Sequence, residues 1–169
     1  MTEQEIWAKA FALQSQADWQ AYQYLIKNED LPECQWLHFL QMACEKLAKA
    51  SLLESGQNPD TLYTSHVWAA KVLPTLYTDY HRSRGRVRDS GYLLRTAKQL
   101  CQEIDKLHPS ADRETRPDNC EYPWEAADRV ISPLDWTFHP SRLVTVPGGP
   151  TFIKLIKAAI ARIIDELEN

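Results

Sequence analysis

One segment, from Asp112 to Gly149, limits what this 169-residue chain can fold into. It contains five of the ten prolines and two of the six tryptophans, and it lacks the apolar spacing found elsewhere in the chain. An irregular stretch of this length is uncommon inside a small domain and is usually either functional or disordered. Four aromatic side chains can bury enough area here to offset the entropy of ordering, so we expect an ordered loop. These aromatic residues are Tyr122, Trp124, Trp136 and Phe138.

Apolar residues in the rest of the chain recur at three- and four-residue spacing, which is typical of amphipathic helices. Pro74 lacks a backbone donor, so it should kink the third of these helices or end it early. No run alternates for long enough to support a sheet, although Leu143–Val146 is either a short strand or an extended loop. Helices are expected from Thr2 to about Lys27, from Pro32 until Gly56, and from about Ser65. A fourth helix carries Leu93 to Ile104 and ends before His108, and the last runs from Thr151 to about Leu167.

The sequence therefore predicts an all-α fold, an up-and-down bundle of four or five helices that forms a single domain over residues 1–169. A long irregular, aromatic- and proline-rich loop at 108–149 precedes the last helix. The most apolar stretch, Phe152–Ile164, is interrupted by charged side chains, so no membrane span is expected. The four cysteines show no CxxC pairing, which favours reduced thiols in a cytoplasmic protein.

The stretch from Ala43 to His66 resembles the HEPN superfamily of helical-bundle proteins. It contains Glu45-Lys46, then Lys49, small residues and leucines, then Gly56, and finally His66 at the start of the next helix. The resemblance implies an up-and-down bundle and frequent dimerisation. It also implies a link to RNA cleavage or nucleotide binding in toxin–antitoxin and defence settings.

The active nucleases of that superfamily carry an arginine followed, after four to six residues, by a histidine. None of the histidines in this chain follows an arginine at that distance. Where a nuclease would place the motif, Arg116 is followed by Asn119 and Tyr122 but by no histidine. The absence of this histidine argues against conventional nuclease activity. The histidines are His38, His66, His81, His108 and His139.

A run of arginines lies between the third and fourth predicted helices. The stretch His81–Leu100 has six basic residues and one acidic residue, a net +5, in a chain whose net charge is −4. Guanidinium groups suit phosphate oxygens, so this run is a candidate anion site. The alternative is a solvated corner that pairs with acidic groups or a second protomer, which charge runs more often are. The run consists of Arg82, Arg84, Arg86 and Arg88.

The long loop supplies a second candidate site. Arg116, Asn119, Tyr122 and Trp124 offer a cation, neutral hydrogen-bonding groups and a stacking face, which together suit a nucleotide. The same residues could instead attach the loop to the bundle. His66 sits at a predicted helix start, where an anion can bind, although capping by Ser65 or Thr64 also explains that position.

Two further pairs follow helical spacing. Glu45 and Lys49 are four apart, as in an ordinary surface ion pair, and would face a cleft or a dimer seam if the HEPN resemblance holds. Cys34 and His38 could contribute two metal ligands, but no second pair has matching spacing, so no metal is expected. The sequence contains no Gly-rich phosphate loop and gives no reason to expect a cofactor.

The leading interpretation is a cytoplasmic, homodimeric HEPN-like protein without catalysis. It would bind a nucleotide, an RNA or a partner protein through the arginine run and the Arg116–Trp124 loop. One alternative is a metal-independent ribonuclease that uses His66 or His81 with Arg82, Arg116 and Tyr122. Another is a structural protein whose aromatic loop forms an interface. Likeness of fold cannot choose among these.

Overall fold

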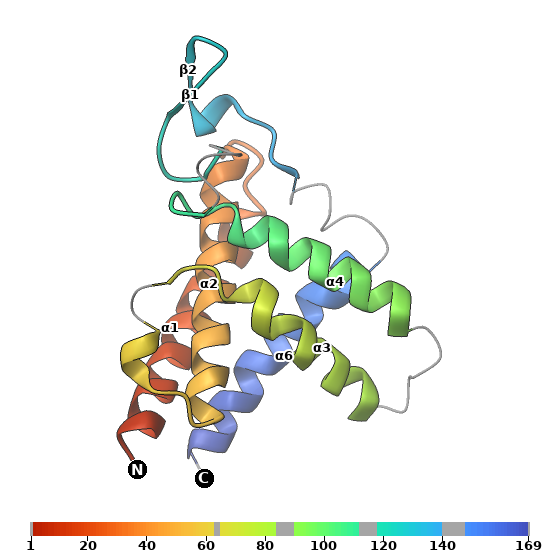
Figure 1. Cartoon of the computed structure of the whole chain (residues 1–169). Helices are drawn as coiled ribbons and strands as arrows, with labels where there is room; N and C mark the ends of the chain where they lie inside the picture. The colour runs from red at the N-terminus through yellow and green to blue at the C-terminus, as the bar shows by residue number, and fades with distance from the viewer. Residues whose placement is uncertain (1, 63–64, 84–89, 112–117, 140–147, 169) are drawn as a thin grey trace.

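The computed structural model describes residues 2–62, 65–83, 90–111, 118–139 and 148–168. Within these residues the fold is all-α, as the sequence predicts (Figure 1). The fourth predicted helix, which carries Leu93 to Ile104 and ends before His108, runs over Ser90–Asp105. The long helices are α1 (Glu3–Leu25), α2 (Glu33–Glu54), α3 (Ala69–Ser83), α4 (Ser90–Asp105) and α6 (Gly149–Glu168).

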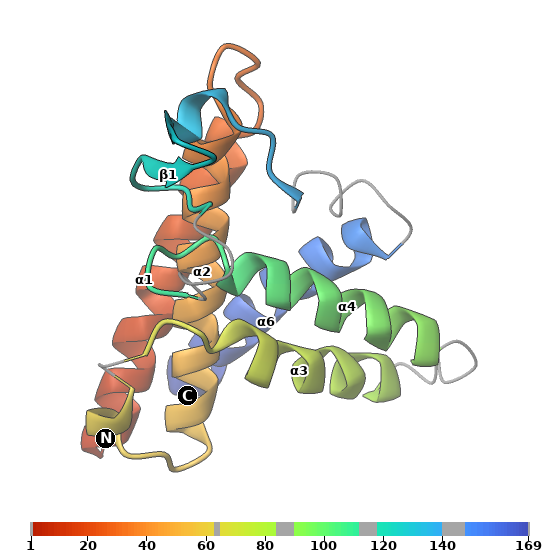
Figure 2. The ribbon, with the colours of Figure 1, turned by 45° about the horizontal axis from the view of Figure 1, so that its top comes forward.

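The helices form two antiparallel pairs. α1 lies along α2, and α3 lies along α4 in a second pair that diverges from the first (Figures 1 and 2). α6 contacts all four of the other helices and closes the bundle. Both termini lie near the same end of the α1–α2 pair (Figure 1). None of the described helices is long and apolar enough to cross a membrane.

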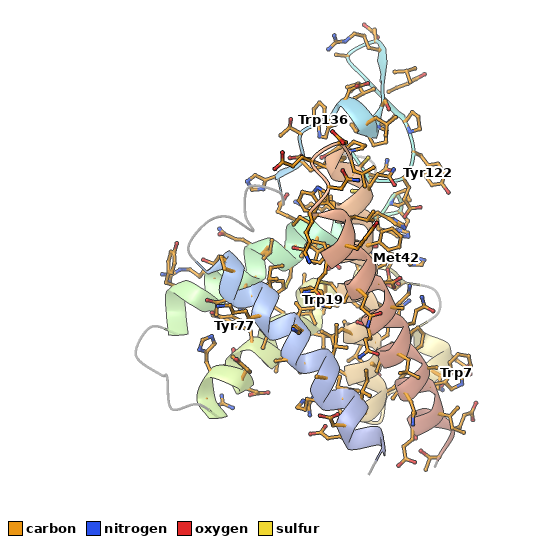
Figure 3. All side chains as sticks on the ribbon, turned by 180° about the vertical axis from the view of Figure 1, so that it is seen from behind. Trp7, Trp19, Met42, Tyr77, Tyr122 and Trp136 are labelled. Atoms are coloured by element: carbon orange, nitrogen blue, oxygen red, sulfur yellow. The ribbon has the colours of Figure 1, made fainter. Side chains whose placement is uncertain are left out.

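The core lies where α2 and α6 meet the other helices. α2 buries leucine and alanine side chains, including Leu40 and Leu47, and α6 buries phenylalanine, leucine and isoleucine side chains, including Phe152 and Ile160. Trp19 of α1 adds to the same cluster of buried residues and points into the bundle (Figure 3). Because α2 is covered from several sides, even its polar positions are buried there.

The helix ends follow local chemistry. The Thr2 side chain accepts a hydrogen bond from the Glu5 backbone, and the Glu5 carboxylate accepts one from the Thr2 backbone, which forms a capping box. Pro32 precedes α2 as its N-cap residue. Gly56, with φ of 89°, lies just beyond the end of α2 in the left-handed conformation that glycine tolerates best.

The third helix begins later than predicted and does not end early at Pro74. It begins at Ala69 rather than near Ser65, and it continues through Pro74 to Ser83. The Thr78 hydroxyl donates to the Pro74 carbonyl oxygen at 2.9 Å inside the helix. Pro74 lies in the second turn, where its missing donor removes at most one helical hydrogen bond.

The predicted irregular segment contains a small hairpin that the sequence did not indicate. Strands β1 (Trp124–Ala126) and β2 (Arg129–Ile131) pair antiparallel. Their turn residues, Ala127 and Asp128, both have positive φ, 49° and 58°, as a tight two-residue turn requires. A 3₁₀ turn follows at Pro133–Asp135, and another lies at Pro59–Thr61 after α2. The candidate strand Leu143–Val146 lies outside the described residues.

Candidate functional site

A polar cluster lies buried on α2. Glu45 and Lys49 are both buried, although their spacing predicts a surface ion pair, so that prediction was wrong. Glu45 Oε1 accepts a hydrogen bond from Lys49 Nζ at 2.7 Å, and Oε2 accepts one from Gln41 Nε2 at 3.0 Å. Burial acts to raise the pKa of Glu45, but these hydrogen bonds and the Lys49 charge hold it below its usual value.

His66 completes the coordination of this carboxylate. Its Nδ1 lies 3.1 Å from Glu45 Oε1, and about two fifths of its side chain (39%) is exposed. A carboxylate can only accept hydrogen bonds, so His66 Nδ1 carries a proton. In the neutral ring, Nε2 then keeps its lone pair and can act as a hydrogen-bond acceptor or a base.

His108 stacks on His66 with ring centroids 4.0 Å apart and planes within 9° of parallel. Its Nδ1 accepts a hydrogen bond from the Ser110 backbone N–H at 3.2 Å and lies 2.7 Å from the Ser110 hydroxyl oxygen. The proton of the neutral ring is therefore on Nε2. Burial, and secondly the charge of His66, lower the pKa of His108 to about 4. His108 is thus an uncharged donor at neutral pH.

Asp105 positions the chain that carries His66. It lies at the end of α4, and its two oxygens accept hydrogen bonds from the backbone N–H groups of Ala69 and Ala70 at 3.0 and 2.9 Å. Burial raises the pKa of Asp105 to about 6, against the effect of these hydrogen bonds. The Asp105 carboxylate therefore caps the N-terminus of α3, where the sequence predicted either an anion site or a cap from Ser65 or Thr64. Thr64 lies outside the described residues.

Together these residues form what we call the histidine cluster. It combines a buried carboxylate, a buried ammonium group, and two stacked imidazoles that offer one acceptor and one donor nitrogen. Such a set can transfer protons or hydrogen-bond to a ligand. The histidine cluster consists of Gln41, Glu45, Lys49, His66 and His108.

The described loop candidates make local contacts within the loop. Asn119 is buried, and its Oδ1 accepts hydrogen bonds from the backbone N–H groups of Glu121 and Tyr122 at 2.9 and 2.7 Å. Trp124 is buried edge-to-face against Trp136, with ring centroids 5.6 Å apart. Tyr122 itself is exposed. Arg116 lies outside the described residues.

The arginine run is described only at its first member. Arg82 is exposed and donates to Asp79 Oδ1 at 2.9 Å, beside a shallow cavity of about 370 Å³ that Lys98 also lines. The whole length of α3, about 20 Å at 1.5 Å per residue, separates Arg82 from the end that carries His66. His81 is buried next to Arg82, also far from His66. Arg84, Arg86 and Arg88 lie outside the described residues.

Cys34 and His38, the candidate metal ligands, belong to no larger set of ligands in the described part of the chain. Within the described residues, no group of three or more histidine, cysteine or acidic side chains could hold a metal ion. His38 Nδ1 lies 3.7 Å from a Glu121 carboxylate oxygen. All four cysteines are free and buried.

Sequence analysis singled out Glu45, Lys49 and His66 but did not bring all three together, and it did not single out Gln41 or the stacking of His108. The spacing of Glu45 and Lys49 was a usable signal for their contact, but nothing indicated their burial. His108 carried no signal at all, because its stacking partner lies far away in the sequence.

No protein-family model matches the chain, and no curated protein or solved structure is significantly similar to it. The HEPN resemblance of Ala43–His66 therefore stays a prediction, and the argument for function depends on the site itself.

Proposed function

We propose that this chain is a HEPN-like helical-bundle protein that binds RNA or a nucleotide at the histidine cluster. The supporting observation is that a buried Glu45–Lys49 pair holds the half-exposed His66 against His108. A buried ion pair is a poor source of stability, because desolvation offsets its attraction. Charged groups with perturbed pKa values collect at functional sites, so a functional reason for this arrangement is favoured.

The chemistry of the stacked rings suits a nucleobase. Unpaired bases stack on aromatic and histidine side chains and hydrogen-bond along their edges. His66 and His108 supply one flat pair with an acceptor and a donor nitrogen. The charges of Glu45 and Lys49 cancel, so a phosphate would find its cations elsewhere. Arg82 and Lys98 line a cavity toward the far end of α3, which favours an RNA over a free nucleotide.

Metal-independent RNA cleavage is the second candidate function. The contact between Glu45 and His66 favours it, because a carboxylate that fixes a histidine tautomer leaves Nε2 available as a general base. His108, a neutral ring with its proton on Nε2, would supply a hydrogen-bond donor beside this base. Of the unconventional set that the sequence suggested, this version keeps His66 and leaves out His81 and Arg82.

We further propose that the protein is cytoplasmic and homodimeric, and that it acts in a toxin–antitoxin, defence or regulatory setting. The four free, buried cysteines support a reducing compartment. The dimer and the setting depend on the HEPN resemblance alone.

Titration of a fluorescein-labelled single-stranded RNA into the protein, without metal and at two salt concentrations, tests binding. We expect His66→Ala and His108→Ala each to weaken binding about tenfold, the effect of losing one stacking contact. His139→Ala is the matched control, because His139 lies 3.3 Å from Glu103 and outside the histidine cluster. Equal affinity in the wild type and both cluster variants would contradict the proposal.

The same RNA, incubated with chelator and run on a denaturing gel, separates the two candidates. RNA that is bound but intact supports binding alone. Cleavage that His66→Ala abolishes and His139→Ala preserves supports the ribonuclease.

A further inference from the structure

Residues 118–139 form a second distinctive feature, which we call the hairpin knob. It contains β1, β2 and the 3₁₀ turn, and it stands out from the bundle at the end where α2 begins (Figures 1 and 2). Four of the nine large apolar side chains that the described residues expose lie in it. Exposed apolar side chains gathered in one short segment make it a candidate interaction surface. The four are Tyr122, Val130, Leu134 and Trp136.

The hairpin knob is firmly attached to the bundle. Phe138 is fully buried, and its backbone N–H donates to Glu33 Oε2 at 3.0 Å. The Cys120 backbone N–H donates to the Leu107 carbonyl oxygen at 3.0 Å. Trp124 packs into the core cluster and against Trp136. These contacts fix both ends of the hairpin knob, so its apolar side chains are held outward by an ordered structure.

The register of the hairpin determines which side chains face outward. Trp124 pairs with Ile131, and both pack against the core. Side chains alternate along a strand, so the next pair, Glu125 with Val130, faces the opposite side. Val130 is 72% exposed there. A one-residue slip would bury Val130 and expose Trp124, so the exposure of Val130 follows from the fold.

The charge around this apolar surface is negative. Within residues 118–139, the exposed residues Glu125, Asp128 and Asp135 stand against one exposed cation, Arg129, which leaves a net charge of 1 − 3 = −2 for this segment. Nucleic acid is repelled by such a surface, whereas a lysine- or arginine-bearing partner is attracted. Within the described residues the sheet has only these two strands, so each strand also has an open edge. An extended segment can add to such an edge.

We propose that the hairpin knob docks a basic segment of a partner protein, one that carries apolar side chains among its lysines or arginines. The partner's cations would face Glu125, Asp128 and Asp135, and its apolar side chains would cover Val130 and its neighbours. The site is distinct from the histidine cluster, but not remote from it. Glu121 in the hairpin knob contacts His38, and the charge of His38 also acts on the pKa of His108.

Selection of a random dodecapeptide phage library on the full chain tests this proposal. We expect the recovered peptides to combine arginine or lysine with apolar residues. Synthetic copies should bind V130S/L134S and D128N/D135N at least about tenfold more weakly than wild type, the loss of one hot-spot contact. Ile6→Ser is the matched control, because Ile6 is also exposed but lies near the start of α1. Circular dichroism checks that each variant is folded.

Peptides without basic residues would overturn the proposal, as would failure to recover any peptide that distinguishes wild type from V130S/L134S. Sedimentation of wild type and V130S/L134S tests whether a second copy of the chain, and not a basic partner, covers the hairpin knob. A dimer that dissociates only in the variant would mean that a second copy covers the hairpin knob, and the basic partner would then be wrong. A sedimentation coefficient that is the same for both proteins agrees with the proposal.

Discussion

Two ion pairs in this molecule have the same spacing and nearly the same length but very different surroundings. Lys49 and Glu45 in α2 approach to 2.7 Å with side chains 6% and 5% exposed. Arg162 and Glu166 in α6 approach to 2.6 Å with side chains 46% and 49% exposed. Spacing along the helix produces both contacts, but packing decides how much each contributes to the stability of the fold. An exposed pair contributes about 0–1 kcal/mol, whereas breaking a buried pair costs about 3–5 kcal/mol.

The strongest test of this difference removes the buried ammonium group. Lys49→Met should lower the free energy of unfolding by about 3 kcal/mol, because it leaves Glu45 ionised and buried with only neutral partners and His66. Urea unfolding measures the change. Adding Glu45→Gln should recover much of the loss, because the unpaired charge is then gone. A loss below about 1 kcal/mol for Lys49→Met would mean that the buried pair behaves like a surface pair.

A second pair of variants extends the comparison from ion pairs to helix caps. Asp105→Ala should lower the free energy of unfolding by about 2 kcal/mol, because it leaves the buried N–H group of Ala69 and the half-buried N–H group of Ala70 without their acceptor. Thr2→Ala removes the exposed cap of α1 and should cost about 1 kcal/mol or less. Thermal or urea unfolding of both variants measures the two losses in free energy of unfolding. Equal losses would show that burial does not strengthen the α3 cap.

Burial also gives the site two opposing pH dependences. The pKa of Asp105 is raised to about 6, so between pH 4 and 6 the folded chain holds a proton that the unfolded chain has lost. This contribution to stability therefore falls as pH rises. The pKa of His108 is lowered to about 4, so the unfolded chain holds the extra proton up to about pH 6.5, and this contribution rises with pH.

Single substitutions should separate the two effects. Relative to wild type, Asp105→Ala should make stability rise more steeply between pH 4 and 6, and His108→Gln should make it rise less steeply or fall. Urea midpoints measured across this range give both slopes. If both variants changed the slope in the same direction, one of the two assignments would be wrong.

The sequence predicted the long helices because each carries its own apolar stripe, as in α6 from Phe152 to Ile164. It could not predict where α3 begins, because the acceptor for its first N–H groups is Asp105, a residue on another helix. The hairpin was missed because its strands are only three residues long. Its turn, Ala127-Asp128, also lacks the glycine that usually indicates one.

The site was less predictable than the fold. The contact between Glu45 and Lys49 follows from helix geometry, but their burial depends on packing among the helices, as where the Ser15 hydroxyl of α1 donates to the Ala43 carbonyl oxygen of α2 at 2.7 Å. The stacking of His66 on His108 depends on how α3 and α4 return to the bundle, which no local pattern records. The sequence therefore predicts contacts between residues one helical turn apart, but it does not predict contacts between residues that are distant along the chain.

The smallest expected effect completes the comparison. Arg162→Met breaks the ion pairs of Arg162 with Glu166 and with Glu54 and should change the free energy of unfolding by about 1 kcal/mol or less, because both carboxylates keep their contact with water. Salt in the buffer should reduce even this effect. A double-mutant cycle of Arg162→Met with Glu166→Gln, measured beside Lys49→Met with Glu45→Gln, gives the two coupling energies directly. A coupling energy in α6 as large as that in α2 would mean that spacing, and not burial, decides the strength of both pairs.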